Sequence, residues 1–448
     1  MTIYIIILVL VIIGVVKYDL NKVPFVSKED EPATNLLITV DQQAHPQSLP
    51  VREGSNYSQA DDSAEEESTP LPQKEGLGSG FAGHLNIHIR LLYEQPWSEV
   101  LFYTILVILI GVSTFGYKMG SDTAFYEEEF YHYHTLFNLR PSDFFHERYQ
   151  PGWVIFQSAC RSIFDSYYFM KFIFAVFVNT AVFLTIRRYT RFVFFGILFY
   201  CLSSFLYFNF EILRQAMGIA IFLLAYSFVL RRKWHYYFLC VLLAYSMHNS
   251  AAILMFVPLF HTFDRSALAG ILLLCLLVFF NSAWLGQTIT EFMASDLLAN
   301  TSASEYLAYD STLSLARIRT YLILFVFPVV MLLVFRLDGI KIRYYATIMF
   351  YAITVIATEF VWALFRLQQY FTIFVCIFYV ESFIYLARRL TLNYRRIVAP
   401  LLMSLIVYVY IASYFAKIRD MNRMSYERYF PYTSVFNKEQ APYRDDMR

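Results

Sequence analysis

Charged residues are scarce in this chain. Only 16% of its 448 residues are Asp, Glu, Lys or Arg, and the formal net charge is +1. Such a chain lacks the basic surface that binds phosphate backbones, so we expect no nucleic acid among its partners. Cysteine is scarce too. The five cysteines lie in apolar segments without a C-x-x-C spacing, which speaks against a disulfide framework or a cysteine metal site.

Several catalytic motifs are also missing from the sequence. It contains no H-E-x-x-H, no Walker loop and no G-x-S-x-G, and its expected outer loops contain no D-x-D. His132 and His134 lie close to the acidic run 127–129, but on an aromatic segment this is a weak metal signal. We therefore expect no metal ion and no cofactor.

Hydrophobic residues, in contrast, make up 58% of the chain and aromatic residues 19%. This composition predicts an all-α, polytopic membrane protein of about 11–12 transmembrane helices. Residues 1–16 lack a basic n-region and a small-residue cleavage site, which predicts a retained first transmembrane helix. We expect three further parts: a disordered polar cytoplasmic loop at 17–94, a polytopic membrane catalytic domain at 95–416, and an outward-facing tail at 417–448.

The basic clusters set the expected topology. By the positive-inside rule, the clusters lie in the cytoplasm; they occupy 187–191, 231–233, 336–343 and 388–396. The segment 151–165 then cannot cross, and the same holds for 123–137, so we expect both to be juxtamembrane helices in the first long outer loop. By the same parity, 236–262 forms two short helices that meet near 246–249, with His248 at the break.

This topology brings ionisable residues to the outer membrane side at several separate turns. Arginine recognises phosphate oxygens through its planar donors, and a carboxylate or imidazole can accept a proton. The catalytic candidates are Asp122, His248 and Glu211, and Glu211 is also placed to orient Arg214. The substrate-binding candidates at these turns are Arg214, Gln215, Arg317, Arg319, Glu359 and Arg366.

Each of these residues also has a structural explanation. An arginine at a helix end often anchors the membrane interface, and a membrane histidine often serves helix packing. Asp122 follows Gly120-Ser121 and is also placed to cap the helix expected from residue 123.

An ordered set of motifs gives further information on the function of these residues. They are GSDTAFY at 120–126, a helix beginning PGW at 151–153, LRQAMGIAI at 213–221, AYSMHNSAAILMFVPLF at 244–260, FRLQQYF at 365–371 and PYTSVF at 431–436. Together they resemble the EpsG-like polysaccharide polymerases, which are related in role to the Wzy O-antigen polymerases. The resemblance covers about 97–436. One position departs from it, because Gln150 stands before Pro151 where relatives often have Glu.

The resemblance implies a GT-C-like glycosyltransferase. Its activity would join polyprenyl-pyrophosphate-linked oligosaccharide repeat units at the outer face of the bacterial inner membrane. Asp122 matches the acidic position, Arg214 and Gln215 the RQ pair, His248 the helix-break histidine and Arg366 the arginine before the YF pair. Tyr126, in the first motif, is a further substrate-binding candidate. The expected partners are the lipid-linked glycan, the lipid bilayer, and a chain-length regulator or flippase of the same pathway.

Two other functions remain open at this point. A membrane O-acyltransferase that modifies the glycan would use His248 as its base. A transporter or flippase of lipid-linked sugars would use the intramembrane charges as a translocation path.

Overall fold

The computed structural model describes residues 2–19, 96–120, 122–144, 150–262, 270–271, 274, 345–360, 364–389, 429–430 and 432–440. Apart from residues 96–99, every residue discussed below belongs to one of the two compact units of the chain, Met1–Phe25 with Val100–Arg448. Within the described ranges the secondary structure is helical, apart from one isolated β-bridge between Gly116 and Ser434.

Long apolar helices form the framework. In the described part of the chain, three helices are long and apolar enough to cross a membrane: α3 (Pro96–Phe115), α7 (Tyr167–Tyr189) and α10 (Leu213–Leu230). Shorter apolar helices accompany them. The protein is therefore an all-helical, multi-pass membrane protein, as its composition predicts. The expected count of 11–12 spanning helices stays a prediction, because it includes segments outside the described ranges.

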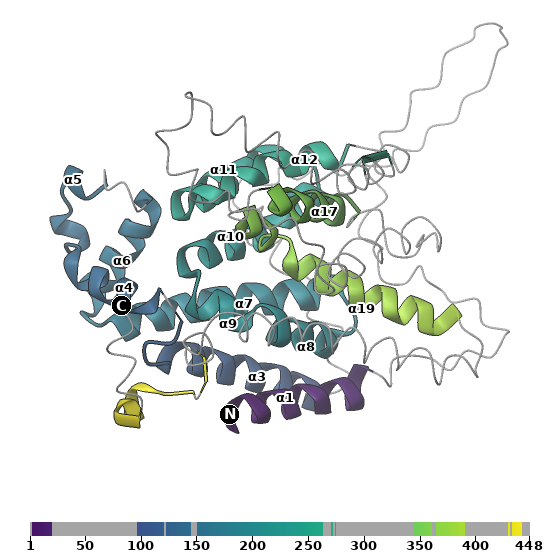
Figure 1. Cartoon of the computed structure of the whole chain (residues 1–448), viewed down its shortest axis with the longest axis horizontal. Coiled ribbons are helices and arrows are strands. Elements are labelled where there is room, and N and C mark those ends of the chain that lie inside the picture. Colours follow the sequence, from purple (N-terminus) through teal and green to yellow (C-terminus); the bar gives the residue numbers. More distant parts are fainter. Residues whose placement is uncertain are drawn as a thin grey trace, which may run out of the picture. The chain divides into compact units, whose positions relative to one another are not determined.

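The α10–α11 hairpin shows how basic residues end a span. α10 stops at Leu230, and Arg232 takes the left-handed conformation (φ 55°) that turns the chain into α11 (Trp234–Met247). α11 then packs along α10, and α7 lies along another side of α10 (Figure 1). Arg187 and Arg188 lie in the last turn of α7, where positive charge is favoured by the helix dipole.

The apolar segment 192–210 forms two helices instead of one. α8 (Val193–Ser203) and α9 (Phe205–Phe210) meet at Ser204. α1 (Thr2–Gly14), which continues as a π-helical turn (Val15–Asp19), packs beside α8. Asp19 accepts a hydrogen bond from the backbone N–H of Phe195 at 2.8 Å, in the first turn of α8. The carboxylate thereby satisfies an N–H that has no partner within its own helix.

Between α3 and α7 the chain forms short helices, as expected for the segments 123–137 and 151–165. They are α4 (Thr123–His132), a 3₁₀ turn (Leu136–Asn138), α5 (Pro141–Phe144) and α6 (Pro151–Ile163). The helix expected over 123–137 ends earlier, because Tyr133 is extended. The Arg161 guanidinium donates to the carbonyls of Tyr131, in the last turn of α4, and of Tyr133, just after it, and so satisfies carbonyl groups at this helix end.

The second half of the described chain contributes further helices. α11 breaks at His248, as expected, and is followed by a 3₁₀ helix (Asn249–Phe256) and α12 (Val257–Phe260). α17 (Tyr345–Phe360) packs against α12, and α19 (Thr372–Arg389) contacts α7 and α8. The short α18 (Phe365–Gln368) lies between α17 and α19 in the chain.

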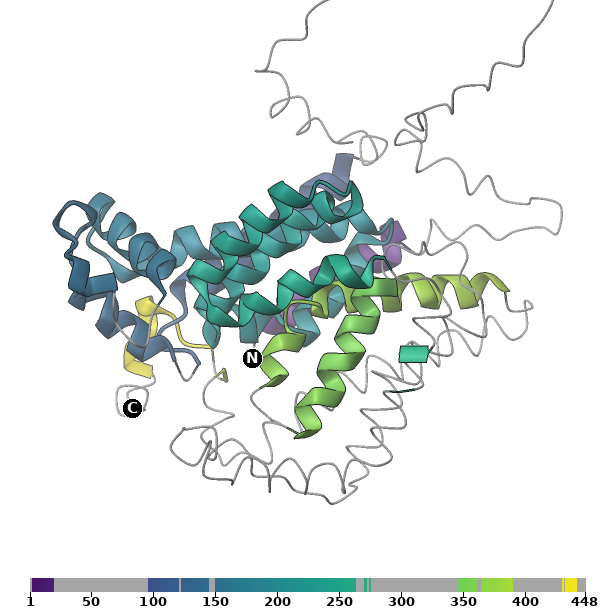
Figure 2. The same cartoon turned by 90° about the horizontal axis from the view of Figure 1, so that it is seen from above.

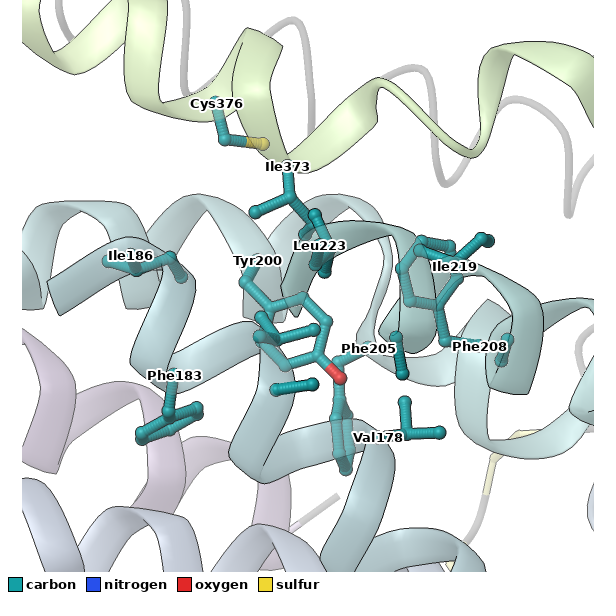
Figure 3. Packing of buried hydrophobic residues seen from close by; sticks show 14 of the residues in the cluster. Val178, Phe183, Ile186, Tyr200, Phe205, Phe208, Ile219, Leu223, Ile373 and Cys376 are labelled. Atoms are coloured by element: carbon teal, nitrogen blue, oxygen red, sulfur yellow. The ribbon is translucent and has the colours of Figure 1, made fainter. Parts of the chain in front are cut away.

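Apolar packing and a few interhelical hydrogen bonds hold these helices together, since lipid tails offer no hydrophobic drive for association. Figure 3 shows Val178 of α7, Phe205 and Phe208 of α9, and Ile219 of α10 around Tyr200, all of them buried. The C-terminal segment also joins this unit. Tyr117, just after α3, donates its N–H to the Thr433 carbonyl at 2.9 Å. The segment 432–440, yellow in Figure 2, therefore lies beside the end of α3.

Candidate active site

The position of Asp122 is determined by close backbone packing before α4. Gly120 has a φ of +87° and packs so tightly against the Phe210 backbone that a Cβ atom would collide with its carbonyl. The Thr123 hydroxyl donates to the Phe210 carbonyl at 2.9 Å and contacts the Met119 carbonyl. These contacts hold Asp122 beside the end of α9. Its side chain makes no capping hydrogen bond to α4, so capping does not explain this aspartate.

The turn between α9 and α10 carries the next candidates. Glu211 is the last residue of the α9 turn, and Arg214 and Gln215 lie in the first turn of α10. A helix N-terminus carries partial positive charge, so this turn favours an anion before any side chain is counted. Glu211 is buried and accepts a 2.7 Å hydrogen bond from the Tyr429 hydroxyl. The C-terminal segment therefore reaches the central turn.

Arg214 lies against Tyr126 of α4, with its guanidinium carbon 5.9 Å from the ring centroid. Burial raises the pKa of the Tyr126 phenol, and the charge of Arg214 and a hydrogen bond from it oppose this rise. Asp122 raises that pKa further and Arg366 lowers it, so both charges act on this phenol. Tyr126 thus stays a protonated phenol at neutral pH, with an O–H that can donate.

Gln215 connects α10 to α18. Its Nε2 donates to the Arg366 carbonyl at 2.5 Å, which fixes the backbone that carries the Arg366 side chain. The Gln215 side chain is almost fully buried, yet its Oε1 accepts no hydrogen bond in the described part of the chain. A buried acceptor without a donor costs about 1–3 kcal/mol, so this atom is poised for a ligand or a water molecule.

His248 stands at the helix break and has a defined tautomer. Its Nδ1 accepts the Ser250 backbone N–H at 3.2 Å and lies 2.6 Å from the Ser250 hydroxyl. The Ser250 hydroxyl in turn lies 3.1 Å from the Tyr370 hydroxyl. Because Nδ1 accepts a backbone N–H, the ring proton is on Nε2. The positive charges of Arg214 and Arg366 both act on this imidazole, and its Nε2–H can donate a hydrogen bond.

Six of the predicted residues therefore meet in one place. We call them the charged cluster: Asp122, Tyr126, Glu211, Arg214, His248 and Arg366. Gln215 joins the cluster through the Arg366 backbone. Arg317 and Arg319 lie outside the described residues. Glu359 is in α17, but its side chain is not among those described, so all three remain predictions.

Several neighbours of this cluster are not predicted from the sequence. Tyr207 of α9 lies where Arg366, Glu211 and Asp122 all act on its phenol. Ser250 and Tyr370 support His248, and Tyr429 supports Glu211. Tyr370 lies within the FRLQQYF motif, which gave a local signal for it. Tyr207 and Tyr429 are two of 36 tyrosines, and nothing in the sequence distinguishes them.

The arrangement combines three chemical abilities. Two guanidinium groups and a helix N-terminus can neutralise a diphosphate. The Asp122 carboxylate, near the Tyr126 phenol, can take a proton from a hydroxyl group. The His248 Nε2–H and the Tyr126 O–H can each donate a hydrogen bond to a departing oxygen. The described residues contain no group of three His, Cys, Asp or Glu side chains that could hold a metal ion.

Comparison with known proteins identifies the family but no individual relative. No curated protein and no solved structure matches the chain significantly. The family model described as the EpsG family matches residues 99–434, which include the whole charged cluster. The chain belongs to the EpsG family.

Proposed function

We propose that this protein is a membrane glycosyltransferase that joins polyprenyl-pyrophosphate-linked repeat units into a surface polysaccharide, at the outer face of the bacterial inner membrane. Membership of the EpsG family supports a role in polysaccharide synthesis. The observation that carries the polymerase assignment is the charged cluster itself. A carboxylate and two arginines converge there from α4, α10 and α18, elements far apart in the sequence.

The proposed step is a displacement at the anomeric carbon of the donor glycan. A hydroxyl of the acceptor repeat unit loses its proton to Asp122 and forms the new C–O bond. The bond from the anomeric carbon to the pyrophosphate breaks, and the lipid pyrophosphate leaves with the electron pair. Arg214 and Arg366 neutralise that charge, and the N-terminus of α10 adds to the stabilisation.

The other polar groups take positioning roles. Glu211 is restrained by Tyr429 and orients the first turn of α10, which carries Arg214. The His248 Nε2–H and the Gln215 side chain hydrogen-bond the oxygens of the substrate. His248 accepts a bond at Nδ1 and carries its proton on Nε2, which speaks against O-acyltransfer with this imidazole as the base.

A deletion strain tests the function. We expect it to lose long-chain polysaccharide and to accumulate single repeat units on the lipid carrier. Polymer of full length without acyl groups would instead indicate the acyltransferase, and lipid-linked units held in the cytoplasmic leaflet would indicate the flippase. Unchanged polymer in the deletion strain would refute all three.

Arg214→Ala, expressed in that strain, tests the site. Removal of a charged partner of the transition state costs roughly 2.7–4 kcal/mol in comparable sites, so polymer formation should fall by about 10²–10³. Arg188→Ala is the matched control, because Arg188 lies in the last turn of α7, far along the helix from the cluster. Full chain length with Arg214→Ala would remove this residue from the site.

A further inference from the structure

One face of α6 contains a run of buried polar groups without partners. Trp153, Gln157 and Ser158 are fully buried, each at 0% exposure. Trp153 Nε1, both amide atoms of Gln157 and Ser158 Oγ make no hydrogen bond within the described part of the chain. Trp153 and Gln157 are four residues apart and therefore share a helix face. We call these three residues the α6 polar face.

This concentration is unusual for a folded protein. Roughly 90% or more of buried polar groups in native structures have a partner, and each one left unpaired costs about 1–3 kcal/mol. The buried Asn209 of the same unit shows the usual behaviour. It uses both its oxygen and its nitrogen in hydrogen bonds. Four unpaired atoms on adjacent turns of one short helix therefore indicate that something else satisfies them.

The α6 polar face lies next to the charged cluster. The Trp153 ring lies 5.7 Å from the ring of Tyr126, in an edge-on arrangement. At the start of α6, Gly152 packs against Ser246, two residues before His248, so closely that a Cβ atom would collide with it. Trp153 thus contacts a member of the charged cluster, and Gly152 contacts a residue two positions before another member. A molecule bound at Arg214 and Tyr126 would extend directly to α6.

The chemistry of the face differs from that of the cluster. The α6 polar face offers an indole N–H, an amide that both donates and accepts, and a hydroxyl, and none of them carries a charge. Uncharged donors and acceptors beside aromatic rings match the hydroxyl groups and the apolar C–H face of a sugar. A diphosphate would instead require the guanidinium groups of the charged cluster.

We propose that the α6 polar face is a binding subsite for a sugar ring of the lipid-linked glycan. The inference rests on the proposed function, since it assigns the glycan and its pyrophosphate to adjacent places. The sugar hydroxyls replace the missing partners of Trp153, Gln157 and Ser158. Because these groups are fully buried in this structure, the proposal requires α6 to separate from its neighbours when the sugar binds.

Gln157→Met tests the proposal because methionine keeps the side-chain length and removes both polar atoms. Trp153→Phe keeps a ring against Tyr126 and removes the N–H. Ser162→Ala on the same helix is the matched control, since its hydroxyl already donates to the Ser158 carbonyl at 2.7 Å. The full-length proteins are purified in detergent. The probe is the repeat-unit oligosaccharide that mild acid releases from the lipid-linked pool of the deletion strain, and binding is read as the shift in thermal midpoint.

We expect wild type and Ser162→Ala to bind the oligosaccharide. Gln157→Met and Trp153→Phe should bind it at least about ten-fold more weakly, with a thermal midpoint without ligand that is unchanged or higher, because no hydrogen bond of the apo protein is lost. Wild-type affinity in both variants would overturn the proposal and assign the unpaired atoms to water. Loss of folding in both would also overturn it, since it would show that these atoms have structural partners.

The deletion strain and the purified protein together distinguish a failure of the sugar subsite from a failure of the proposed function. If the deletion strain loses polymer but wild-type protein shows no midpoint shift with the oligosaccharide, the subsite fails and the polymerase assignment stands. If the deletion strain keeps its polymer, the polymerase assignment fails first.

Discussion

Two polar clusters of this protein differ in whether their hydrogen bonds are complete. The first, which we call the asparagine cluster, consists of Ser113, Asn179, Tyr200 and Asn209, from α3, α7, α8 and α9. Asn209 Oδ1 accepts from Ser113 at 2.8 Å and from Asn179 at 2.9 Å. Tyr200 donates to Asn179 at 2.8 Å, and Asn209 Nδ2 donates to the Tyr200 hydroxyl and the Phe205 carbonyl. Every member is satisfied within the protein.

The charged cluster and its neighbours are incomplete by comparison. Gln215 Oε1 and the α6 polar face have no hydrogen-bond partner among the described residues, although they are buried. A satisfied polar network rigidifies the helices that it joins, whereas unsatisfied buried groups are costly. The comparison therefore distinguishes a cluster that stabilises the fold from a cluster that we propose binds substrate. The asparagine cluster joins four helices, whereas we propose that the open groups beside Arg214 bind a substrate.

The largest effect is expected at the charged cluster. Asp122→Asn keeps the size of the side chain and removes the proton acceptor, so polymer synthesis should fall by about 10²–10⁴ while the thermal midpoint changes little. The measurement is polymer length on a gel and turnover of lipid-linked units by purified protein. Asp165→Asn is the control, since Asp165 is exposed and pairs with Arg161 at 3.0 Å. Retention of polymer with Asp122→Asn would assign the base to another group.

Gly120→Ala should have the next largest effect. The added Cβ collides with the Phe210 backbone and forces a positive φ on alanine, which costs about 1–2 kcal/mol or more and displaces Asp122. We expect a roughly ten-fold loss of turnover together with a lower thermal midpoint. Gly111→Ala is the matched substitution in α3, where a Cβ meets nothing within 4 Å, and it should behave as wild type. Equal behaviour of the two variants would contradict the packing argument.

Asn209→Leu tests the other side of the comparison. It leaves Ser113, Asn179 and Tyr200 short of partners, so the free energy of unfolding should fall by about 1–3 kcal/mol. Turnover per folded molecule should stay at the wild-type level, because the asparagine cluster contacts no substrate. Thr185→Val is the control, since the Thr185 hydroxyl bonds only to Ala181 in its own helix among the described residues. A loss of turnover without a loss of stability would mean that the two clusters are coupled.

The sequence predicts the parts of the site that interrupt an apolar pattern. Arg214 stands between apolar runs, His248 falls where parity requires a broken helix, and Asp122 follows a glycine. Such residues are detectable because charges and breaks are costly at membrane depth. The order of the family motifs along the chain then supports the assignment of these residues to one site. The interruption of the span at Ser204 was not predicted, because an apolar segment can break without changing its hydropathy.

The remaining parts of the site depend on contacts between distant residues. Tyr429 reaches Glu211 across 218 positions, and Trp153 meets Tyr126 only because the fold brings α6 to α4. Neither contact has a local signature in a chain with 36 tyrosines. The unpaired amide of Gln157 is likewise invisible in sequence, since satisfaction of a polar group depends on everything around it. Arg317, Arg319 and Glu359 stay predictions.

The smallest effect is expected where the C-terminal segment supports the cluster. Tyr429→Phe removes the hydrogen bond to Glu211, worth about 0.5–1.5 kcal/mol, so the apparent KM for lipid-linked substrate should rise by roughly two- to ten-fold with little change in kcat. Tyr432→Phe is the control, because its hydroxyl donates to the Val112 carbonyl at 3.2 Å instead.

A double-mutant cycle distinguishes positioning from general support. If Tyr429 acts through Glu211, then Tyr429→Phe should add no further rise in KM in a Glu211→Gln background, whereas two independent effects would add. Additive behaviour with an equal fall in thermal midpoint for both tyrosine variants would reduce Tyr429 to a packing residue. A non-additive result would instead show that Tyr429 positions the turn that carries Arg214 through its hydrogen bond to Glu211.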